Sequence, residues 1–139
     1  MLVNKQQVET FIPQKSPFVM VDTLLSYTQT TSVSQLLIKD DNLFLKNGFF
    51  QEPGLIENIA QTAALSSGYK AQIANEPIKK GFIGAVKRLK VFKLPGTGDL
   101  LTTSIHILNN VMNASILKGE IKINDVLIAE CELTIFTDE

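Results

Sequence analysis

The sequence predicts an α+β fold in which one antiparallel β-sheet wraps around a single long helix. One helical pattern, residues 54–75, is apolar or small on more than one side, and strand patterns lie before it and, in larger number, after it. A helix with several apolar sides must be covered by protein, and the strands are the elements available to cover it. Because the chain has 139 residues, 45% of them hydrophobic, we expect residues 1–139 to form one domain.

The helix is the best-defined element. Apolar residues recur at the i, i+3, i+4, i+7 and i+8 positions: Ile56, Ile59, Ala60, Ala63 and Ala64. Pro53 precedes this segment, and Asn75 and Pro77 follow it, which predicts a helix from Gly54 to Asn75. A helix of this length extends roughly 30 Å, enough to run along the inside of a curved sheet.

The segments on either side of the helix are typical of strands, because they are rich in β-branched residues or alternate in polarity. Before the helix, residues 18–21 and 32–39 predict one strand pair, and residues 4–11 predict a short helix that serves as a lid or packing flap. After it, the predicted strands are residues 83–92, 100–108, 115–123 and 126–136. The irregular stretch 40–53 contains Phe49 and Phe50, and loops with buried aromatic residues often border a binding site.

Composition and charge argue against several classes of protein. Thirteen Lys and Arg residues are balanced by 14 Asp and Glu residues, which leaves no broad basic surface for nucleic acid. The single cysteine, Cys131, cannot form an internal disulfide, and one cysteine with one histidine cannot assemble a zinc site. The first residues lack a signal-peptide pattern, and the apolar run 55–65 is shorter than the roughly 20 residues that cross a bilayer. We expect a cytoplasmic protein with no metal, nucleic acid or membrane partner.

Glu57 is the residue that most suggests chemistry, because it lies near the start of an otherwise apolar helix. Gln61 follows one turn later on the same side, and Gly68 continues that side without a side chain. Gly54 would leave the backbone amides of the first turn open to a carbonyl oxygen or oxyanion. In the alternative interpretation, the Glu57 side chain points to water, and its negative charge is simply stabilised by the positive, amino-terminal end of the helix dipole.

Other reactive residue types have simpler interpretations. His106 alternates with the more apolar set of its strand, so we expect it to face outward, and Cys131 shares the apolar side of its strand. The one basic cluster is Lys87, Arg88, Lys90 and Lys93. It predicts either a solvated or lysine-protected edge strand, or a docking patch for an acidic or phosphate-bearing partner.

In chain order, these segments resemble the hotdog-fold family of β-hydroxyacyl-acyl-carrier-protein dehydratases. Residues 12–22 look like the family's opening, Leu-Pro-His-Arg-x-Pro-Phe-x-x-Val-Asp, and Glu57-Asn58-Ile59-Ala60-Gln61 looks like its Glu-Ala-x-Ala-Gln helix motif after a Pro-Gly pair. Residues 84–90, 94–96 and 129–134 resemble the strands and turn that follow. The resemblance covers about residues 12–136. It implies a hotdog fold, in which an antiparallel sheet wraps a central helix, and a 3-hydroxyacyl thioester substrate.

The chain departs from the family pattern at the histidines. In that family, a histidine from a Gly-His-Phe-Pro motif is paired with the helix glutamate across a dimer interface. Here the matching segment is Gly48-Phe49-Phe50, with Phe49 in the histidine position, and Gln14 replaces the histidine of the opening motif. Dehydration needs a base for the α-proton and an acid for the departing hydroxyl. A homodimer of this chain would therefore supply only the carboxylate.

Three hypotheses follow. In the first, the chain is a dehydratase subunit completed by a histidine-bearing hotdog partner, similar to the dehydratase pairs of aryl polyene and flexirubin-type pigment biosynthesis. In the second, Glu57 activates water and the protein is a hotdog thioesterase. In the third, the chain is a non-catalytic acyl-binding or scaffold subunit, and Glu57 belongs to a buried polar network.

The first hypothesis assigns roles to particular residues. Glu57 and Gln61 would be catalytic, and the predicted substrate contacts are Gly54, Phe49, Phe50, Ala64, Gly68 and Gly84. The acyl chain would run toward Ala64 and Gly68, and the phosphopantetheine arm would leave near the basic cluster, which would dock the acyl carrier protein. The resemblance implies no cofactor beyond the phosphopantetheine of a carrier protein or coenzyme A. Because a single sheet leaves an edge exposed, we expect a dimer or a larger assembly, with either a second copy of this chain or the histidine-bearing subunit as the partner.

Overall fold

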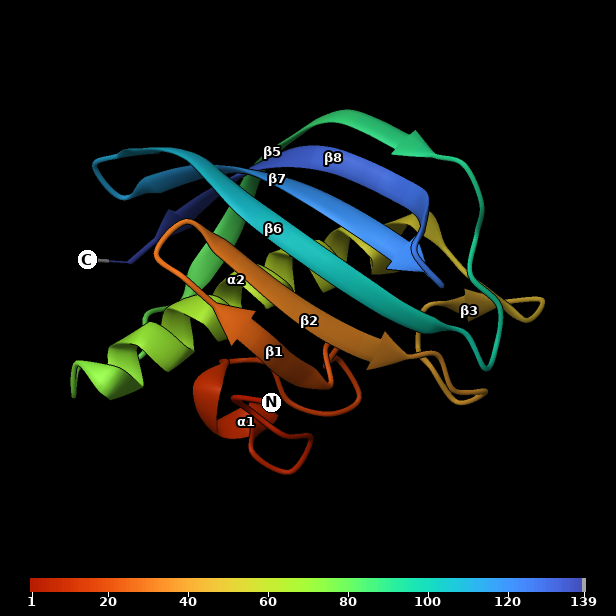
Figure 1. The fold of residues 1–139 in the computed structure, drawn as a ribbon, viewed down its shortest axis with the longest axis horizontal. Helices are drawn as coiled ribbons and strands as arrows, with labels where there is room; N and C mark the ends of the chain where they lie inside the picture. The colour runs from red at the N-terminus through yellow and green to blue at the C-terminus, as the bar shows by residue number, and fades with distance from the viewer. Residues whose placement is uncertain (139) are drawn as a thin grey trace.

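The computed structural model of the protein describes residues 1–138 as an antiparallel sheet curved around one long helix (Figure 1). The two helices are α1 (Val8–Phe11) and α2 (Glu52–Ile73). The sheet consists of β1 (Thr23–Tyr27), β2 (Thr31–Leu37), β5 (Gly81–Val91), β6 (Leu100–Val111), β7 (Ala114–Ile123) and β8 (Val126–Thr137). The short strands β3 (Leu45–Lys46) and β4 (Phe49–Phe50) form a separate hairpin in the loop before α2.

The six strands lie in the order β1-β2-β6-β7-β8-β5, and every neighbouring pair is antiparallel. The strands cross over α2, and α1 lies beside β1, at the end of the sheet opposite β5 (Figure 1). The prediction of one antiparallel sheet around one long helix is confirmed. Both β1 and β5 are end strands, so each has one side without a strand partner in residues 1–138.

Helix α2 begins at Glu52 and not at the predicted Gly54. Gln51 is the extended N-cap residue, and Pro53 lies in the first turn, where its missing N–H costs no helical hydrogen bond. Glu57 therefore lies in the second turn. At the other end, Asn75 has a φ of 55°, a left-handed conformation that asparagine tolerates, and the helix stops two residues before it at Ile73.

Two apolar clusters pack against α2 from different sides, as the prediction of several covered faces requires. Leu55 and Ile59 belong to the cluster beneath the sheet, while Leu65 belongs to a second cluster formed with α1 and β1. These three side chains are at most 1% exposed. Burial of this kind stabilises each by about 1.5–3 kcal/mol relative to exposure, so α2 is fixed by packing on both sides.

The N-terminal segments differ from their predictions. Residues 18–21 are not a strand, because side chains of α2 and not a strand ladder bind their backbone: Asn58 Nδ2 donates to Met20 O at 2.8 Å. The predicted helix over residues 4–11 is helical only from Val8 to Phe11. Asn4 and Gln7 instead close a turn in which each side-chain oxygen accepts the other residue's backbone N–H.

The four strands after α2 agree with their predicted segments to within a few residues. The β7–β8 turn has positive φ at both Asn124 (49°) and Asp125 (65°), the conformation of a tight two-residue hairpin. In β8, Ala129, Cys131 and Leu133 are buried at alternate positions. No helix among residues 1–138 has the length and apolar character needed to cross a membrane.

Candidate active site

Glu57 is half-buried and lines a cavity between α2 and the sheet. Its Oε2 accepts a hydrogen bond from Gln61 Nε2 at 2.7 Å. Gln61 is only 1% exposed and is held by the segment before β1: its Oε1 accepts from Met20 N at 2.6 Å, and its Nε2 donates to Phe18 O at 2.9 Å. The glutamate thus lies beside a cavity with one oxygen fixed, which does not fit the alternative interpretation of a side chain in open water.

The cavity has a volume of about 500 Å³ and follows α2 from Glu57 to Lys70. Its middle is apolar, with walls from α2 and from the sheet: Ala60, Ala63, Ala64, Ile83, Ile105, Ile107, Leu117 and Ile135. Polar side chains line the rest, chiefly Tyr27, Gln29, Ser66, Ser67, Lys70, Lys79, Asn110, Ser115 and Thr137. Among the described lining residues, Glu57 is the only carboxylate. An elongated ligand would therefore meet one acidic group, an apolar wall and a polar, cationic end.

Gln14 also lines this cavity, although its sequence position suggested only that it replaces a histidine. Its Oε1 is buried and has no hydrogen-bond partner in residues 1–138. Its place in the opening motif could have indicated that Gln14 lies near the site, because the N-terminal segment that carries this motif lies alongside α2.

Gly54 does not provide the open amide that we predicted. The N–H groups of Gly54 and Leu55 both donate to Gln51 O, at 2.9 and 3.2 Å, and Pro53 has no N–H. Gly54 is buried beneath aromatic rings: a Cβ at this position would lie 2.6 Å from Phe50 Cζ. Phe50 itself is fully buried in the core. Both residues are therefore packing residues, and neither is open to a substrate.

Of the other predicted substrate contacts, one lines the cavity and three do not. Ala64 lines the cavity, and its contact with the substrate stays a prediction. Gly68 does not, because it lies where α1 crosses α2 and a Cβ would collide with the backbone oxygen of Phe11. Gly84 is exposed on β5, and the Phe136 ring occupies the space that a side chain would need. Phe49 is 51% exposed and pairs with Gly96 outside the cavity lining.

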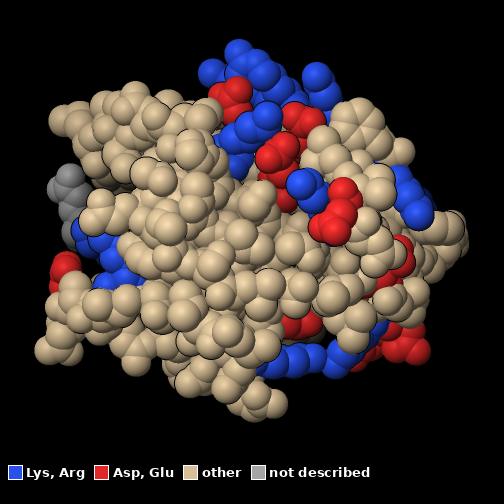
Figure 2. Space-filling view, in the orientation of Figure 1, with Lys and Arg blue, Asp and Glu red and all other residues tan. Residues whose placement is uncertain are grey.

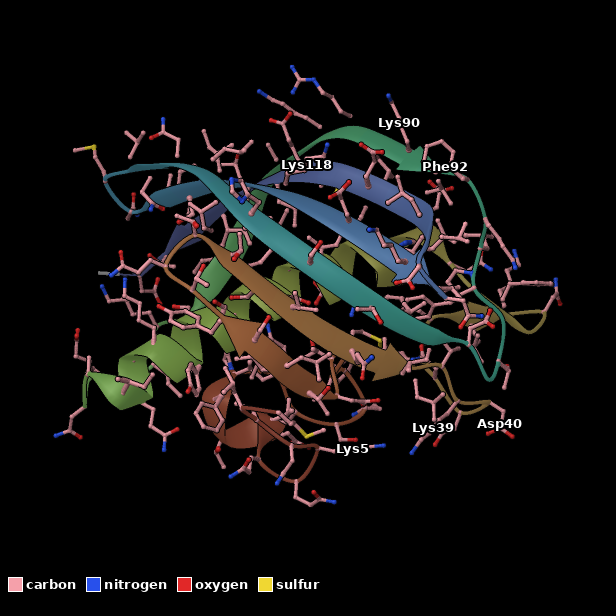
Figure 3. All side chains as sticks on the ribbon, viewed as in Figure 1. Lys5, Lys39, Asp40, Lys90, Phe92 and Lys118 are labelled. Carbon is pink, nitrogen blue, oxygen red and sulfur yellow. The ribbon has the colours of Figure 1, made fainter. Side chains whose placement is uncertain are left out.

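The basic cluster lies on the edge strand β5 and its extension, away from the cavity. Charged side chains of both signs gather over β5, β7 and β8 (Figure 2), and Lys90 points outward from β5 (Figure 3). Arg88 Nη1 forms an ion pair with Glu132 Oε2 at 2.6 Å, and Lys87 and Lys90 lie opposite Glu132 and Glu130 in the β5–β8 register. None of the four residues lines the cavity, so the interpretation as an edge strand fits, and docking stays a prediction.

Sequence reasoning missed the lysines and hydroxyl groups at the far end of the cavity. Lys70 lies in the last turn of α2, and Lys79 lies in the loop before β5. Tyr27 comes from the end of β1, far away in the sequence. No local pattern connects these residues, because only the curvature of the sheet around α2 brings them together.

Two other reactive residue types lie where the sequence predicted. His106 is exposed on β6, and Cys131 is buried, which raises the pKa of its thiol to about 11, with the charge of Glu132 adding to the shift. The described residues contain no group of three or more His, Cys, Asp or Glu side chains that could hold a metal ion.

An antiparallel sheet wrapped around one helix, with a carboxylate in an elongated cavity along that helix, defines a hotdog-fold protein with a candidate acid–base site. A family model described as ApeP-like, ApeP dehydratase, matches residues 6–139, and the chain belongs to this dehydratase family. The predictions of a hotdog fold and of a dehydratase are confirmed.

Curated relatives agree with this assignment, and solved structures share the fold. The 3-hydroxyacyl-[acyl-carrier-protein] dehydratase FabZ of Wolinella succinogenes is 27% identical over 147 residues, which cover 96% of this chain and 94% of the relative. The dehydratase heterocomplex ApeI:P from Xenorhabdus doucetiae has a TM-score of 0.89 at 17% identity, covering 95% of this chain and 91% of that chain. A hypothetical thioesterase with coenzyme A from Streptococcus pneumoniae TIGR4 shares the fold at a TM-score of 0.66, with 11% identity and 84% of each chain covered.

Proposed function

We propose that this protein removes water from a 3-hydroxyacyl thioester as one subunit of a two-subunit dehydratase, and that a histidine-bearing hotdog partner completes the site. The observation that carries this proposal is the composition of the cavity. Glu57 is the only carboxylate among its described lining residues, and the chain's one histidine, His106, lies on β6 outside the lining. One proton-transfer group of the expected kind is present, and we propose that the second comes from another chain.

The reaction requires two proton transfers. A base removes the proton from C2, the electrons of that C–H bond form the C2–C3 double bond, and the C3 hydroxyl leaves with a proton as water. Glu57 would carry out one of these transfers and the partner's histidine the other. Gln61 supports this role because its amide holds one carboxylate oxygen at 2.7 Å.

The relatives support the substrate class and the kind of partner. FabZ proteins similar to this chain are named as dehydratases of 3-hydroxyacyl groups on acyl carrier protein, and the ApeI:P structure is named as a dehydratase heterocomplex. We propose that the acyl group is carried on phosphopantetheine and that no further cofactor takes part.

The edge strand β5 is the surface that we propose for the partner. It is an end strand with exposed apolar side chains on or next to it, including Phe82 (49% exposed), Val86 (39%) and Phe92 (61%). An unpaired edge with apolar side chains favours pairing with another strand. The cavity is lined by residues 81–83 of this same strand, so a partner here would lie beside the cavity.

The thioesterase alternative lacks the oxyanion site that the sequence suggested near Gly54. It relied on open amides near Gly54 to stabilise an oxyanion, and the amides of Gly54 and Leu55 are bonded to Gln51 O. The fold shared with a hypothetical thioesterase does not distinguish the two reactions.

The test is an assay of the chain with a 3-hydroxyacyl thioester, alone and after addition of a histidine-bearing hotdog subunit, following both enoyl formation and thiol release. We expect enoyl product only from the pair, and a loss of about 100-fold or more in rate with Glu57→Gln, given the usual contribution of acid–base catalysis. Glu76→Gln, an exposed residue just after α2, is the matched control.

Three results would contradict the proposal. Thiol release by the chain alone would indicate a thioesterase. Full activity of the pair with Glu57→Gln would indicate a non-catalytic subunit. Enoyl formation by the chain alone would show that no second subunit is needed.

A further inference from the structure

A buried hydroxyl group interrupts the apolar row of β6 that faces α2. Leu101 and Ile105 are buried core residues, and Thr103 between them is 0% exposed. A buried hydroxyl costs free energy unless it is hydrogen-bonded, and this one donates to Asn58 Oδ1 at 2.6 Å. Asn58 lies next to Glu57 on α2 and is also 0% exposed. Because two apolar side chains of the same shape can be about as stable as such a pair, packing alone does not account for it.

The Thr103 hydroxyl fixes the direction of the Asn58 amide. One end of an amide accepts hydrogen bonds and the other end donates them. Since Asn58 Oδ1 is bound to Thr103, Nδ2 lies on the other side of the amide, where it donates to Met20 O at 2.8 Å. Without the hydroxyl, Oδ1 would keep no hydrogen bond within residues 1–138, and the amide could turn away from Met20.

The backbone of Met20 connects this amide to the candidate active site. Its C=O accepts from Asn58, and its N–H donates to Gln61 Oε1 at 2.6 Å, so two side chains of α2 hold both backbone groups of one residue. With Oε1 bound there, Gln61 Nε2 lies on the opposite side and donates to Glu57 Oε2 at 2.7 Å. A series of hydrogen bonds, joined through the Met20 backbone, therefore runs from Thr103 on β6 to the carboxylate.

We propose that Thr103 and Asn58 are positioning residues for Glu57. Neither lines the cavity, so they act on the carboxylate through the Met20 backbone and the Gln61 amide and do not touch the substrate. Every donor and acceptor in the series has one defined direction, which holds one carboxylate oxygen in place and leaves the other for proton transfer. The inference rests on the proposed function, since it assumes that Glu57 transfers a proton during dehydration.

A neighbouring pair of buried hydroxyl groups offers a comparison. Ser34 on β2 lies opposite Thr103 in the β2–β6 register and is also 0% exposed. Its Oγ lies 2.7 Å from Thr62 Oγ1, which in turn donates to the backbone oxygen of Asn58 at 2.7 Å. This pair also joins α2 to the sheet, but it makes no bond to the Asn58 or Gln61 amide. Its loss should lower stability without changing the orientation of the carboxylate.

The experiment uses three variants of the full chain. Thr103→Val removes the hydroxyl while keeping the shape, Thr103→Ser keeps the hydroxyl, and Ser34→Ala is the matched control. Exchange of the Gln61 side-chain amide protons with water, measured by NMR on the isolated chain, reports whether this amide is held. The kcat and KM of the assembled dehydratase report the effect on turnover, and urea unfolding measures the stability of each variant.

We expect Thr103→Val to speed exchange of the Gln61 amide protons at least tenfold and to lower kcat about tenfold with little change in KM. Thr103→Ser should behave like the parent in both measurements. Ser34→Ala should lose as much stability as Thr103→Val, with exchange and kcat unchanged. In the Gln61→Met background, Thr103→Val should lower kcat no further, because the two residues act in one series.

Equal falls in kcat for Thr103→Val and Ser34→Ala would overturn the inference, since they would indicate a general loosening of α2. Unchanged exchange of the Gln61 amide in Thr103→Val would overturn it as well, as would a kcat equal to that of the parent. Failure of the proposed function is distinguishable, because the parent pair would then make no enoyl product, whereas the exchange measurement on the isolated chain would still show whether Thr103 holds Gln61.

Discussion

Gln61 joins the Glu57 carboxylate to the backbone of the segment before β1. Its Nε2 lies 2.7 Å from Glu57 Oε2 and 2.9 Å from Phe18 O, while its Oε1 lies 2.6 Å from Met20 N. A single buried amide thus connects the candidate acid to an extended segment that no strand pairs with. We propose that Gln61 acts as a positioning residue, because its amide holds one oxygen of the Glu57 carboxylate.

Replacing Gln61 should therefore affect both stability and turnover. Gln61→Met keeps the volume but leaves Met20 N–H and Phe18 O without partners, at about 1–3 kcal/mol for each buried group. Urea unfolding measures this loss. In the assembled dehydratase we also expect kcat to fall with little change in KM, because the carboxylate loses its orientation. The exposed Gln72→Met on α2 is the control, and an equal fall in its kcat would contradict the positioning role.

Gly68 is required where α1 crosses α2. The Cβ of Gly68→Ala would collide with the backbone oxygen of Phe11, and backbone cannot move aside as a flexible side chain can. We expect a loss of about 1–3 kcal/mol in the free energy of unfolding, typical of overpacking. Gly96→Ala is the control, because its nearest neighbour would be at 3.7 Å, an ordinary contact. Equal stability of the two variants would show that α1 is not packed as described.

The partner interface can be tested at the end of β5. Phe92 is 61% exposed next to this edge strand (Figure 3), and a charge there should oppose a strand from another subunit. We expect Phe92→Glu to raise the dissociation constant for the histidine-bearing partner subunit at least tenfold, measured by analytical ultracentrifugation. The unfolding temperature of the isolated chain should not change. Met112→Glu, at the fully exposed β6–β7 turn, should leave association unchanged. The interface would lie elsewhere if the Met112 variant dissociated and the Phe92 variant did not.

Cys131 should make stability depend on pH in the alkaline range. Burial raises the pKa of its thiol from 9.0 to about 11, so the folded chain keeps a proton that the unfolded chain loses above pH 9. This contribution to stability is complete below pH 9 and is lost as the pH rises toward 11. Urea unfolding at several pH values should show a steeper decline for the parent than for Cys131→Ala. Parallel declines would mean that the buried thiol does not titrate in this range.

The sequence alone was sufficient for the elements whose local pattern repeats. The apolar spacing of α2 and the alternation of β8 are set by helix and strand geometry, so they could be recognised without neighbours. The helix motif also placed Glu57 and Gln61 on one side of α2, four residues apart, and the structure brings them into hydrogen-bonding contact.

Only the tertiary structure decided which residues share the cavity and which are buried beside it. Gly54 and Gly68 looked like open positions on a helix, yet Phe50 and Phe11 fill the space beside them. Residues 18–21 have strand-like composition, but Asn58 and Gln61 bind their backbone to the helix. Lys70 and Tyr27 line the same cavity only because the sheet curves around α2. A linear pattern records period and polarity, whereas contacts between distant segments depend on how the elements pack.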